Sequence, residues 1–526
     1  MRHGVALAHA GQDGEAIKAF YAAIGLEPNF VDAYYELGSA CHRTGRWEAS
    51  IHVFEALLQQ APAHVPARLA LGAVLIDAKR PVDAEQSLRR GLSEPAPPRL
   101  KAALHANMGL ALRRQRRDQE ALANYDQARQ LDPAIRDLAV HRAEALQNLN
   151  RYDEALAEYR QALSQDVQNP HLHHFYNSLL FRLRRMDEFL KSYDQAPESR
   201  ILQRAKAQFL RLDGRNAEAC SIYQHLLQSD PTDIACQRGA ADALIAMGQL
   251  EEAAKTLDNA LLRDGGNTSL INLAAEIAMR RHDPARALML CRKTLAAAPF
   301  DQLALALMGV CLRLIDDEQG EILNGFDDLI AVFDLAPPDG YSSMESFNTE
   351  LVTHLSRLHP KTREPIDQSL QGGTQTPDHL FGAGHALVDK LESRIRSAVA
   401  DYIGAMQESS DHPFLSRRSR QFQYAGSWSS RLQDCGYHKN HLHPDGWISS
   451  CYYIQVPESS NDTETRQGWI KFGEPNFDAG LPNPIRRSVQ PVAGRLVLFP
   501  SYMWHGTIPF HGDVRTTLAF DVIPGR

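Results

Sequence analysis

The 526-residue sequence has few cysteines, no long apolar run and no excess of basic residues. Its seven cysteines are scattered, odd in number and form no C-x-x-C pair, which argues for a reducing compartment and against a disulfide framework or a zinc ribbon. No apolar run approaches the ~18 residues that a membrane helix needs, and the N-terminal residues lack the pattern of a signal peptide. A formal net charge of -8 offers no concentrated positive surface for phosphates. We therefore expect a cytoplasmic protein with neither a nucleic-acid nor a membrane partner.

The first two thirds of the chain matches itself at an offset of 34 residues. Gly4, Gly38 and Gly72 keep this step, and small residues continue it further along. A second register holds bulky residues, namely Phe20, Phe54, Leu88, Tyr125, Tyr159, Tyr193, Tyr223 and Leu257. Two short helices per unit need a small residue where they cross and a large one that fills the gap beside it. Prolines that recur between the units would end the second helix of each pair.

The repeat step is irregular at two places. It stretches around 95–99, where we expect a loop, and it contracts near Pro197, where we expect a shortened unit. Gly4 occupies the helix-crossing position, so the first helix of the first unit lacks its leading turns. Either that half-unit is a frayed cap or translation begins further upstream.

This period and its anchors resemble the tetratricopeptide repeat. The resemblance covers residues 1–335, with about nine units, and implies an α-solenoid. Such arrays curve into a concave groove, which predicts a protein or peptide partner. The alternative is that the array only holds the C-terminal domain or makes oligomers.

The helical pattern stops at the breakers around 337–340, and we place a second domain at 340–526. Helices are expected within 343–360 and 379–407, and a turn-rich stretch at 368–376. The segments WISSCYYIQV, GRLVLF and TTLAFDVI are rich in β-branched and aromatic residues, so strands are expected there. The predicted fold class is α + β multidomain, an α-solenoid followed by a small antiparallel barrel or double-sheet jelly roll with supporting helices.

The segment HLHPDG carries candidate metal ligands. His441 and His443 alternate, which places both imidazoles on one side of an extended chain. Asp445 follows in a turn and is an alternative ligand, since imidazole suits iron, copper or zinc and a carboxylate makes a site harder. His505, at the end of the predicted strand GRLVLFPSYMW, is the candidate for the distal ligand.

Arg515 and Thr517 are candidates for binding an anion beside the metal. A hairpin turn at 511–513 would pair His505 with Ala519, and strand alternation would then place Arg515 and Thr517 on the same face. A guanidinium binds a carboxylate through two hydrogen bonds, and a hydroxyl can add another. The alternative for Arg515 is a surface ion pair. By alternation Tyr453 can line the same pocket, with core packing as its alternative.

The segments QSLQGGTQT, HLHPDGWISSCYYIQVP, GWIKFGEP and GRLVLFPSYMWHGTIPFHGDVRTTLAFDVIP resemble the 2-oxoglutarate and Fe(II)-dependent oxygenase family found behind tetratricopeptide repeats. The resemblance implies a double-stranded β-helix, Fe(II) held by the histidines, and Arg515 on the 2-oxoglutarate carboxylate. It leaves two ligand sets open. His441, His443 and His505 form an all-histidine set, and the literal H-x-D of His443 and Asp445 with His505 forms the other.

The favoured function is therefore a dioxygenase that uses 2-oxoglutarate and O2 to hydroxylate a peptide or protein recruited by the repeats. A small metabolite or a cell-surface sugar is the second choice of substrate. A different class is a repeat-based adaptor whose β domain is catalytically inactive. A third is a cupin-like metal-binding or isomerase domain that uses no 2-oxoglutarate.

Overall fold

The computed structural model describes residues 1–135, 137–376 and 379–525. The chain divides into two compact units, residues 1–165 with 382–385, and residues 166–381 with 386–526. The division falls inside the repeat array rather than at its end. Among the described residues no helix has both the length and the apolar character to cross a membrane, and all seven cysteines are free thiols.

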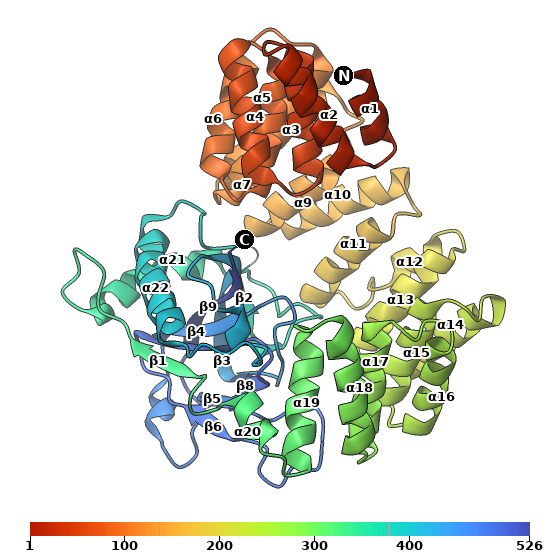
Figure 1. Cartoon of the computed structure of the whole chain (residues 1–526), viewed down its shortest axis with the longest axis vertical. Helices are drawn as coiled ribbons and strands as arrows, with labels where there is room; N and C mark the ends of the chain where they lie inside the picture. The colour runs from red at the N-terminus through yellow and green to blue at the C-terminus, as the bar shows by residue number, and fades with distance from the viewer. Residues whose placement is uncertain (136, 377–378, 526) are drawn as a thin grey trace. The chain divides into compact units, whose positions relative to one another are not determined.

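The first unit contains antiparallel helix pairs, labelled in Figure 1. The helices are α1 Arg2–His9, α2 Asp13–Leu26, α3 Val31–Arg43, α4 Trp47–Gln60, α5 Val65–Asp77, α6 Pro81–Ser93, α7 Pro98–Arg114, α8 Asp118–Leu131, α9 Leu138–Asn148 and α10 Tyr152–Gln165.

Each pair is closed by a small residue of its first helix against a bulky residue of its second. A Cβ added to Gly38 would lie 2.8 Å from Phe54 Cζ, and one added to Gly109 would lie 2.4 Å from Tyr125 Cε1. Both aromatic rings are fully buried. The two registers read from the sequence therefore meet in space, because at these positions only a residue without a side chain lets the second helix approach so closely.

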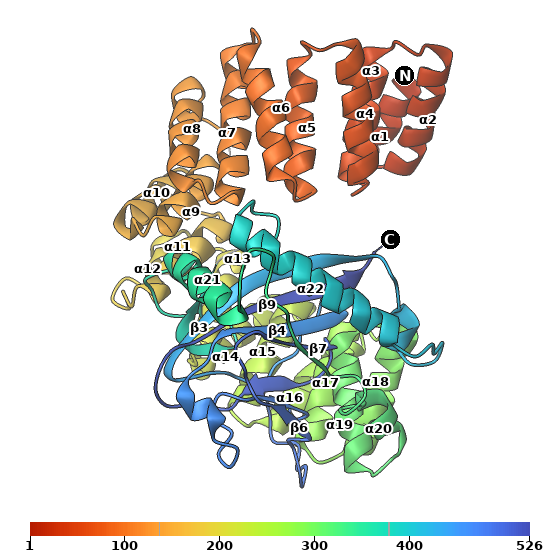
Figure 2. The ribbon, with the colours of Figure 1, turned by 90° about the vertical axis from the view of Figure 1, so that its left-hand side faces the viewer.

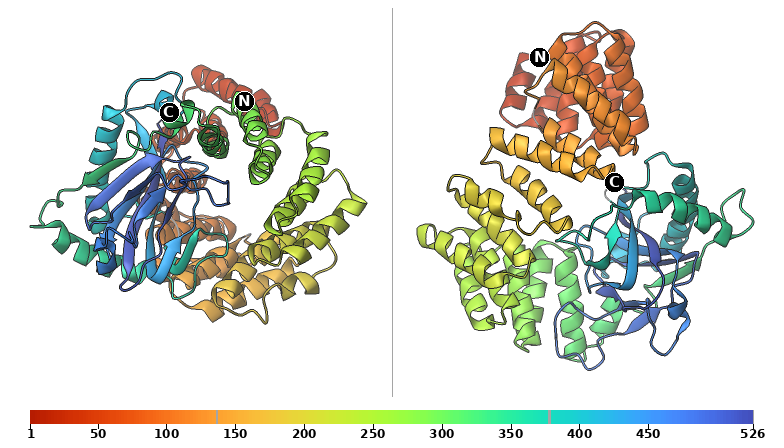
Figure 3. Two further views of the ribbon diagram at one scale, coloured as in Figure 1. Left: turned by 90° about the horizontal axis from the view of Figure 1, so that it is seen from below. Right: turned by 180° about the vertical axis from the view of Figure 1, so that it is seen from behind.

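The second unit continues the helix pairs and then forms the sheets. Its helices are α11 Pro170–Arg182, α12 Lys191–Gln195, α13 Arg200–Leu212, α14 Asn216–Ser229, α15 Ile234–Ala246, α16 Leu250–Leu261, α17 Thr268–Arg280, α18 Pro284–Ala297, α19 Gln302–Leu314, α20 Gln319–Asn324, α21 Met344–Leu358 and α22 Ala386–Ala405. Within this unit α13 to α19 follow one another in a curved row (Figure 3).

Both predicted irregularities of the repeat step can be compared with the helices. The shortened unit near Pro197 is confirmed, because α12 spans only Lys191–Gln195. The loop expected at 95–99 is wrong in part, since α7 already begins at Pro98. The extra residues lengthen α7, and proline is well suited to the first turn of a helix because its missing N–H would be unpaired there.

Nine strands in the described residues form two antiparallel sheets. The six-stranded sheet has the order β1-β7-β4-β9-β3-β2 and the three-stranded sheet the order β6-β5-β8. The strands are β1 Ala331–Asp334, β2 Leu370–Gln375, β3 Phe422–His438, β4 Ile448–Gln455, β5 Ile470–Phe472, β6 Arg487–Val489, β7 Arg495–Pro500, β8 His505–Thr507 and β9 Arg515–Pro524.

The large sheet has two different faces. Helix α22 lies across one of them (Figure 2), and Tyr452 on that face donates a hydrogen bond of 2.8 Å to Asn348 of α21. The opposite face meets the small sheet, where Phe472 of β5 and Phe499 of β7 have ring centroids 5.0 Å apart. The predicted architecture of a helical repeat array followed by a two-sheet β domain is therefore present.

Two segments differ from the expectation. Residues 368–376 do not form the predicted turns, because β2 pairs with β3 over most of that stretch. A Cβ on Gly373 would lie 2.4 Å from the carbonyl oxygen of Arg431, so glycine is used here for close strand contact rather than for a turn. Strand β1 pairs with β7 although it precedes the predicted boundary. The sheet therefore begins before the boundary placed at 335–340.

Candidate metal centre

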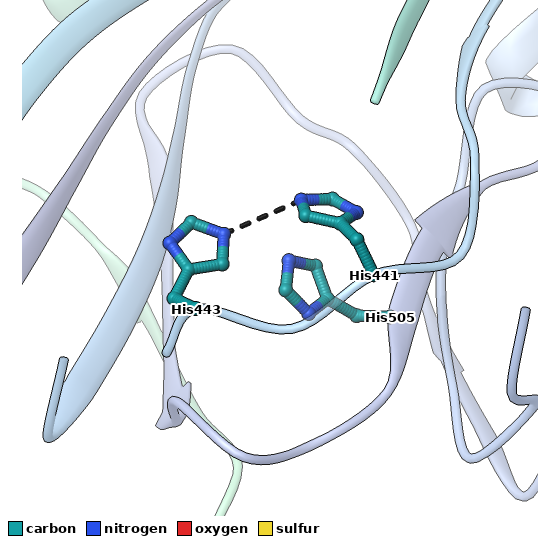
Figure 4. A group of neighbouring side chains, drawn as sticks. All are labelled: His441, His443 and His505. Atoms are coloured by element: carbon teal, nitrogen blue, oxygen red, sulfur yellow. Dashed lines mark hydrogen bonds between the residues drawn. The ribbon is translucent and has the colours of Figure 1, made fainter. Parts of the chain in front are cut away.

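Three histidine side chains converge at the inner face of the small sheet (Figure 4). His441 and His443 lie in the extended segment between β3 and β4, and His505 begins β8. Backbone hydrogen bonds of 2.8 and 3.0 Å join His441 and His505 in both directions. One ring nitrogen from each histidine lies within 4.8 Å of the other two. One β-bridge between His441 and His505 thus brings together residues that are far apart in the sequence.

The hydrogen bonds of the three rings define which nitrogen is free. The Nδ1 atoms of His441 and His505 lie 2.8 and 2.9 Å from the carbonyl oxygens of Lys439 and Met503. The Nδ1 atom of His443 lies 2.8 Å from the Asp521 carboxylate. Carbonyl and carboxylate oxygens can only accept, so each Nδ1 donates and each neutral Nε2 keeps a lone pair.

These lone pairs face one another at short distance. The Nε2 atoms of His441 and His443 are 3.3 Å apart. Burial, followed by the nearby His443, lowers the pKa of His441 to about 3, and burial holds the pKa of His505 well below its usual value. The rings of His441 and His505 are therefore neutral at neutral pH. Two imidazoles at about 2.1 Å from one tetrahedral cation would have nitrogens about 3.4 Å apart, so a divalent metal fits this spacing.

Asp445 is not part of this group. It is exposed in the turn after His443, and the ligand atoms that gather in the described residues belong to His441, His443 and His505. The geometry therefore favours the all-histidine alternative over the H-x-D alternative. The carboxylate that does serve the cluster is Asp521 of β9, which contacts His443 at Nδ1 rather than through a metal.

Arg515 is a buried cation on the same cavity. Its side chain is among the largest fully buried ones, and its Nε has no hydrogen-bond partner. In the part of the chain that the structure describes, no carboxylate forms an ion pair with it. Its guanidinium lies 5.0 Å from the centre of the Tyr453 ring, whose hydroxyl is also without a hydrogen bond. A buried guanidinium without an anion is costly, so this site suits an anionic ligand.

One cavity joins the histidines to this arginine. Side chains from both sheets line it, namely Trp428, Ser430, His438, His441, His443, Ser450, Cys451, Ile470, His505, Gly506, Thr507, Arg515, Thr517 and Ala519. Thr517 therefore lies beside Arg515 in the cavity. Tyr453 is not in the lining; it is fully buried beneath the guanidinium.

The hairpin predicted for 505–519 is wrong. His505 does not pair with Ala519, because β8 pairs with β5 and β9 pairs with β3 and β4. Residues 508–514 instead cross from one sheet to the other. Arg515 faces His505 across the gap between the sheets, so the shared cavity arises from packing and not from strand register.

Two contributors to the site escaped the sequence analysis. Alternation along β9 places Asp521 on the face of Arg515 and Thr517, which is the signal that could have found it. His438, at the end of β3, is half-buried and lines the cavity beside His441, with ring centroids 5.9 Å apart. Desolvation, followed by the neighbouring His441 and Arg515, holds the pKa of His438 well below its usual value. No motif in the sequence marks that residue.

A wider cleft opens on the outer side of His441. Its volume is about 1040 Å³, and charged side chains such as Lys439, Lys471 and Glu474 contribute to its walls. The loop between β5 and β6 forms one wall and packs on the last repeats. Arg313 of α19 donates hydrogen bonds of 2.6 and 2.8 Å to the carbonyls of Gly473 and Asn483. The repeats of this unit therefore support the cleft directly.

Family comparisons agree with this geometry. Residues 426–521 match the family model described as "Putative 2OG-Fe(II) oxygenase". The matched region contains the three clustered histidines, Arg515 and Asp521. Models described as "Tetratricopeptide repeat" match residues 45–107 and 210–277, and residues 1–64 and 106–170. The chain thus joins tetratricopeptide repeats to a region that matches the model of this oxygenase family.

Individual proteins also match parts of the chain. Superkiller protein 3 of Saccharomyces cerevisiae is 38% identical over 61 residues, which are 12% of this chain and 4% of that protein. The chain therefore matches only a small part of that relative. A tetratricopeptide repeat protein from Parabacteroides merdae shares 22% identity over 47% of this chain and 98% of its own, with a TM-score of 0.33. A thermophilic TPR protein of Thermus thermophilus shares 25% identity over 34% of this chain and 96% of its own, with a TM-score of 0.30.

Proposed function

We propose that this protein is an Fe(II)- and 2-oxoglutarate-dependent dioxygenase that hydroxylates a peptide or protein side chain. The observation that carries the proposal is the buried Arg515, which has no anionic partner among the described residues and shares one cavity with three converging imidazoles. Among the described residues the chain supplies no anion for Arg515, and the three imidazoles present nitrogens that a cation could bind. A divalent cation would therefore bind the histidines, and a carboxylate would bind the arginine.

His441, His443 and His505 would hold the Fe(II). Bound Fe(II) with 2-oxoglutarate and O2 supplies oxidising power for hydroxylation, while 2-oxoglutarate is decarboxylated to succinate. The chain's own task is to present three oriented Nε2 lone pairs, which the Nδ1 hydrogen bonds ensure. Since all three ligands would be neutral, the metal would stay more positive than beside a carboxylate ligand. The hydrogen bond from His443 to Asp521 offsets part of that difference.

Arg515 would bind the 2-oxoglutarate carboxylate that is not on the metal. A guanidinium offers two parallel donors to a carboxylate, and the Thr517 hydroxyl lines the cavity beside it. The Tyr453 ring packs under the guanidinium and limits its freedom before the ligand arrives. Pre-ordering of this kind lowers the entropy cost of binding.

The outer cleft is our proposed entrance for the substrate. It borders His441 and Thr507, which also line the inner cavity, and its walls carry both acidic and basic side chains. A cleft of that volume and polarity suits an extended polypeptide segment better than an apolar small molecule. Because the last repeats support the wall of this cleft, we favour a protein substrate that is held by the repeat array.

The cofactor assignment is tested by anaerobic titration of the full chain with Fe(II) and 2-oxoglutarate. We expect a visible metal-to-ligand charge-transfer band that requires both components. R515E should abolish the effect of 2-oxoglutarate while Fe(II) binding persists. A protein that binds Fe(II) but gives no such band with millimolar 2-oxoglutarate would defeat the assignment in favour of a metal-binding domain without this co-substrate.

The substrate class is tested by succinate release in the presence of a cell extract divided by ultrafiltration. We expect the protein fraction to stimulate 2-oxoglutarate turnover and the filtrate to have no effect. Stimulation by the filtrate alone would favour a metabolite or sugar substrate. Binding of extract proteins without any turnover would favour the adaptor function. We also place the protein in the cytoplasm, which its scattered free cysteines support.

A further inference from the structure

A second group of metal-binding side chains lies on the surface of the β domain, away from the three histidines. It consists of Asp434 and Cys435 near the end of β3, and His511 in the segment that crosses between the sheets. All three residues are exposed, and their ligand atoms lie within 4.8 Å of one another. We call them the surface cluster.

The backbone around the surface cluster holds its members in place. Cys435 N–H donates a hydrogen bond of 2.8 Å to the carbonyl of Phe510, and Gly512 N–H donates one of 2.9 Å to Asp434 Oδ1. Cys435 has a φ of 61°, a conformation that non-glycine residues rarely adopt. The two segments are thus tied together beside the cluster before any ligand binds.

The pairwise distances within the surface cluster are similar to the edges of a coordination tetrahedron. Cys435 Sγ lies 3.4 Å from His511 Nδ1 and 3.5 Å from Asp434 Oδ2, and His511 Nδ1 lies 3.4 Å from Asp434 Oδ1. With zinc bond lengths of about 2.3 Å to sulfur and about 2.0–2.1 Å to nitrogen or oxygen, tetrahedral ligands would be about 3.5 Å apart for S and N, about 3.5 Å for S and O, and about 3.3 Å for N and O. The edge between Cys435 and His511 is therefore preformed. Asp434 meets these two residues through different oxygens, and one carboxylate oxygen lies within 4.8 Å of both other ligand atoms.

We propose that Asp434, Cys435 and His511 form a second metal site, which takes a borderline-soft divalent cation of the zinc class. The mixed sulfur, nitrogen and oxygen donors select such an ion over Mg²⁺ or Ca²⁺, which prefer oxygen ligands. Because the cluster is exposed, water takes the fourth position. The cation joins the end of β3 to the segment that leads from His505 to Arg515.

Metal binding at the surface cluster displaces a thiol proton. The thiolate is the metal ligand. Affinity therefore rises with pH, as it does wherever a cation competes with a proton.

Cobalt(II) titration of the full chain tests the proposal, because a cobalt–thiolate bond gives a near-ultraviolet charge-transfer band that histidine ligands do not. In a non-thiol reductant we expect wild type to develop this band and C435S to lack it and to bind one equivalent less. H511A should lower the affinity at least about tenfold, since even outer-shell changes cost that much. D434N should weaken binding in the same direction.

C220S is the matched control, because Cys220 is a free thiol of α14 that belongs to neither group of candidate ligands. It should keep the band and the stoichiometry of wild type. The proposal is overturned if wild type gives no thiolate band at millimolar cobalt, which would leave a hydrogen-bonded cluster only. It is equally overturned if the band survives in C435S or disappears in C220S. None of these outcomes depends on activity of the oxygenase domain.

Discussion

His443 and Asp521, 78 residues apart in the chain, are joined by a hydrogen bond of 2.8 Å from the ring Nδ1 to the carboxylate. The same carboxylate accepts a hydrogen bond of 2.7 Å from the Ser449 hydroxyl. This pair orients one of three imidazoles whose free nitrogens converge. A metal held by the three histidines would therefore have the negative charge of Asp521 nearby, through the hydrogen bond to His443.

D521N tests this relationship. We expect Fe(II) affinity to fall about 10–100-fold, because the partner of a ligating histidine sets its tautomer and orientation. The measurement is anaerobic competition with a chelator of known affinity. D445N is the matched control, since Asp445 is an exposed carboxylate two residues from His443, and it should leave the affinity unchanged. A large loss in D445N with none in D521N would reverse our assignment of the two carboxylates.

R515Q separates ligand binding from stability. Loss of a charge-assisted bond of about 1.5–3 kcal/mol predicts 2-oxoglutarate binding weaker by one to two orders of magnitude in calorimetry. The free energy of unfolding without ligand should not fall, because the variant removes an unpaired buried charge. R495Q is the control, since Arg495 on β7 pairs with Asp334 at 2.8 Å, and its 2-oxoglutarate affinity should equal that of wild type. A marked loss of stability in R515Q would contradict the role of an empty anion site.

The lowered pKa of the buried His359 ring predicts how the free energy of unfolding depends on pH. Its ring is buried between the Ser429 and Thr374 hydroxyls, at 3.1 and 3.0 Å. Burial, and then the charge of Arg431, lowers its pKa from 6.5 to about 4. Between these values the unfolded chain binds a proton that the folded chain does not. The contribution of His359 to the free energy of unfolding is therefore complete above pH 6.5 and is lost as the pH falls toward 4.

We expect H359Q to flatten the acid dependence of unfolding, with His359 accounting for at most about 3 kcal/mol. Urea denaturation at several pH values between about 4 and 7 measures the free energy of unfolding of wild type and H359Q. Other buried histidines such as His412 also have lowered pKa values, so part of the dependence should remain. Identical slopes for wild type and H359Q would show that this ring does not titrate as described.

G109A tests the repeat packing in the first unit. The added methyl would lie 2.4 Å from the Tyr125 ring, so we expect a loss of about 1–3 kcal/mol from overpacking. G25A is the control, because a Cβ there meets nothing within 4 Å, and alanine in a helix should gain about 0.5–1 kcal/mol. Chemical denaturation followed by helical circular dichroism distinguishes them. Equal stability of the two variants would disprove the close helix crossing.

Local patterns predicted much of this molecule. The glycine and aromatic registers of the repeats, the strands β4, β7 and β9, and the supporting helices α21 and α22 all follow from short-range periodicity. Strand β2 was not predicted, because its glycines are typical of turns. Their role in close strand contact becomes visible only where β2 pairs with β3. Edge strands with weak patterns depend on hydrogen bonds to partners distant in the chain.

For the candidate site, the sequence alone predicted residues that the structure brings to one cavity: alternating His441 and His443, a distal His505 and the downstream Arg515. Only the tertiary structure decided how they meet. His505 and Arg515 lie in different sheets, Asp445 turns outward, and Asp521 and His438 join the cavity. The physical reason is that residue type and strand alternation are local properties, whereas the packing of one sheet against another brings together side chains that no spacing in the sequence relates.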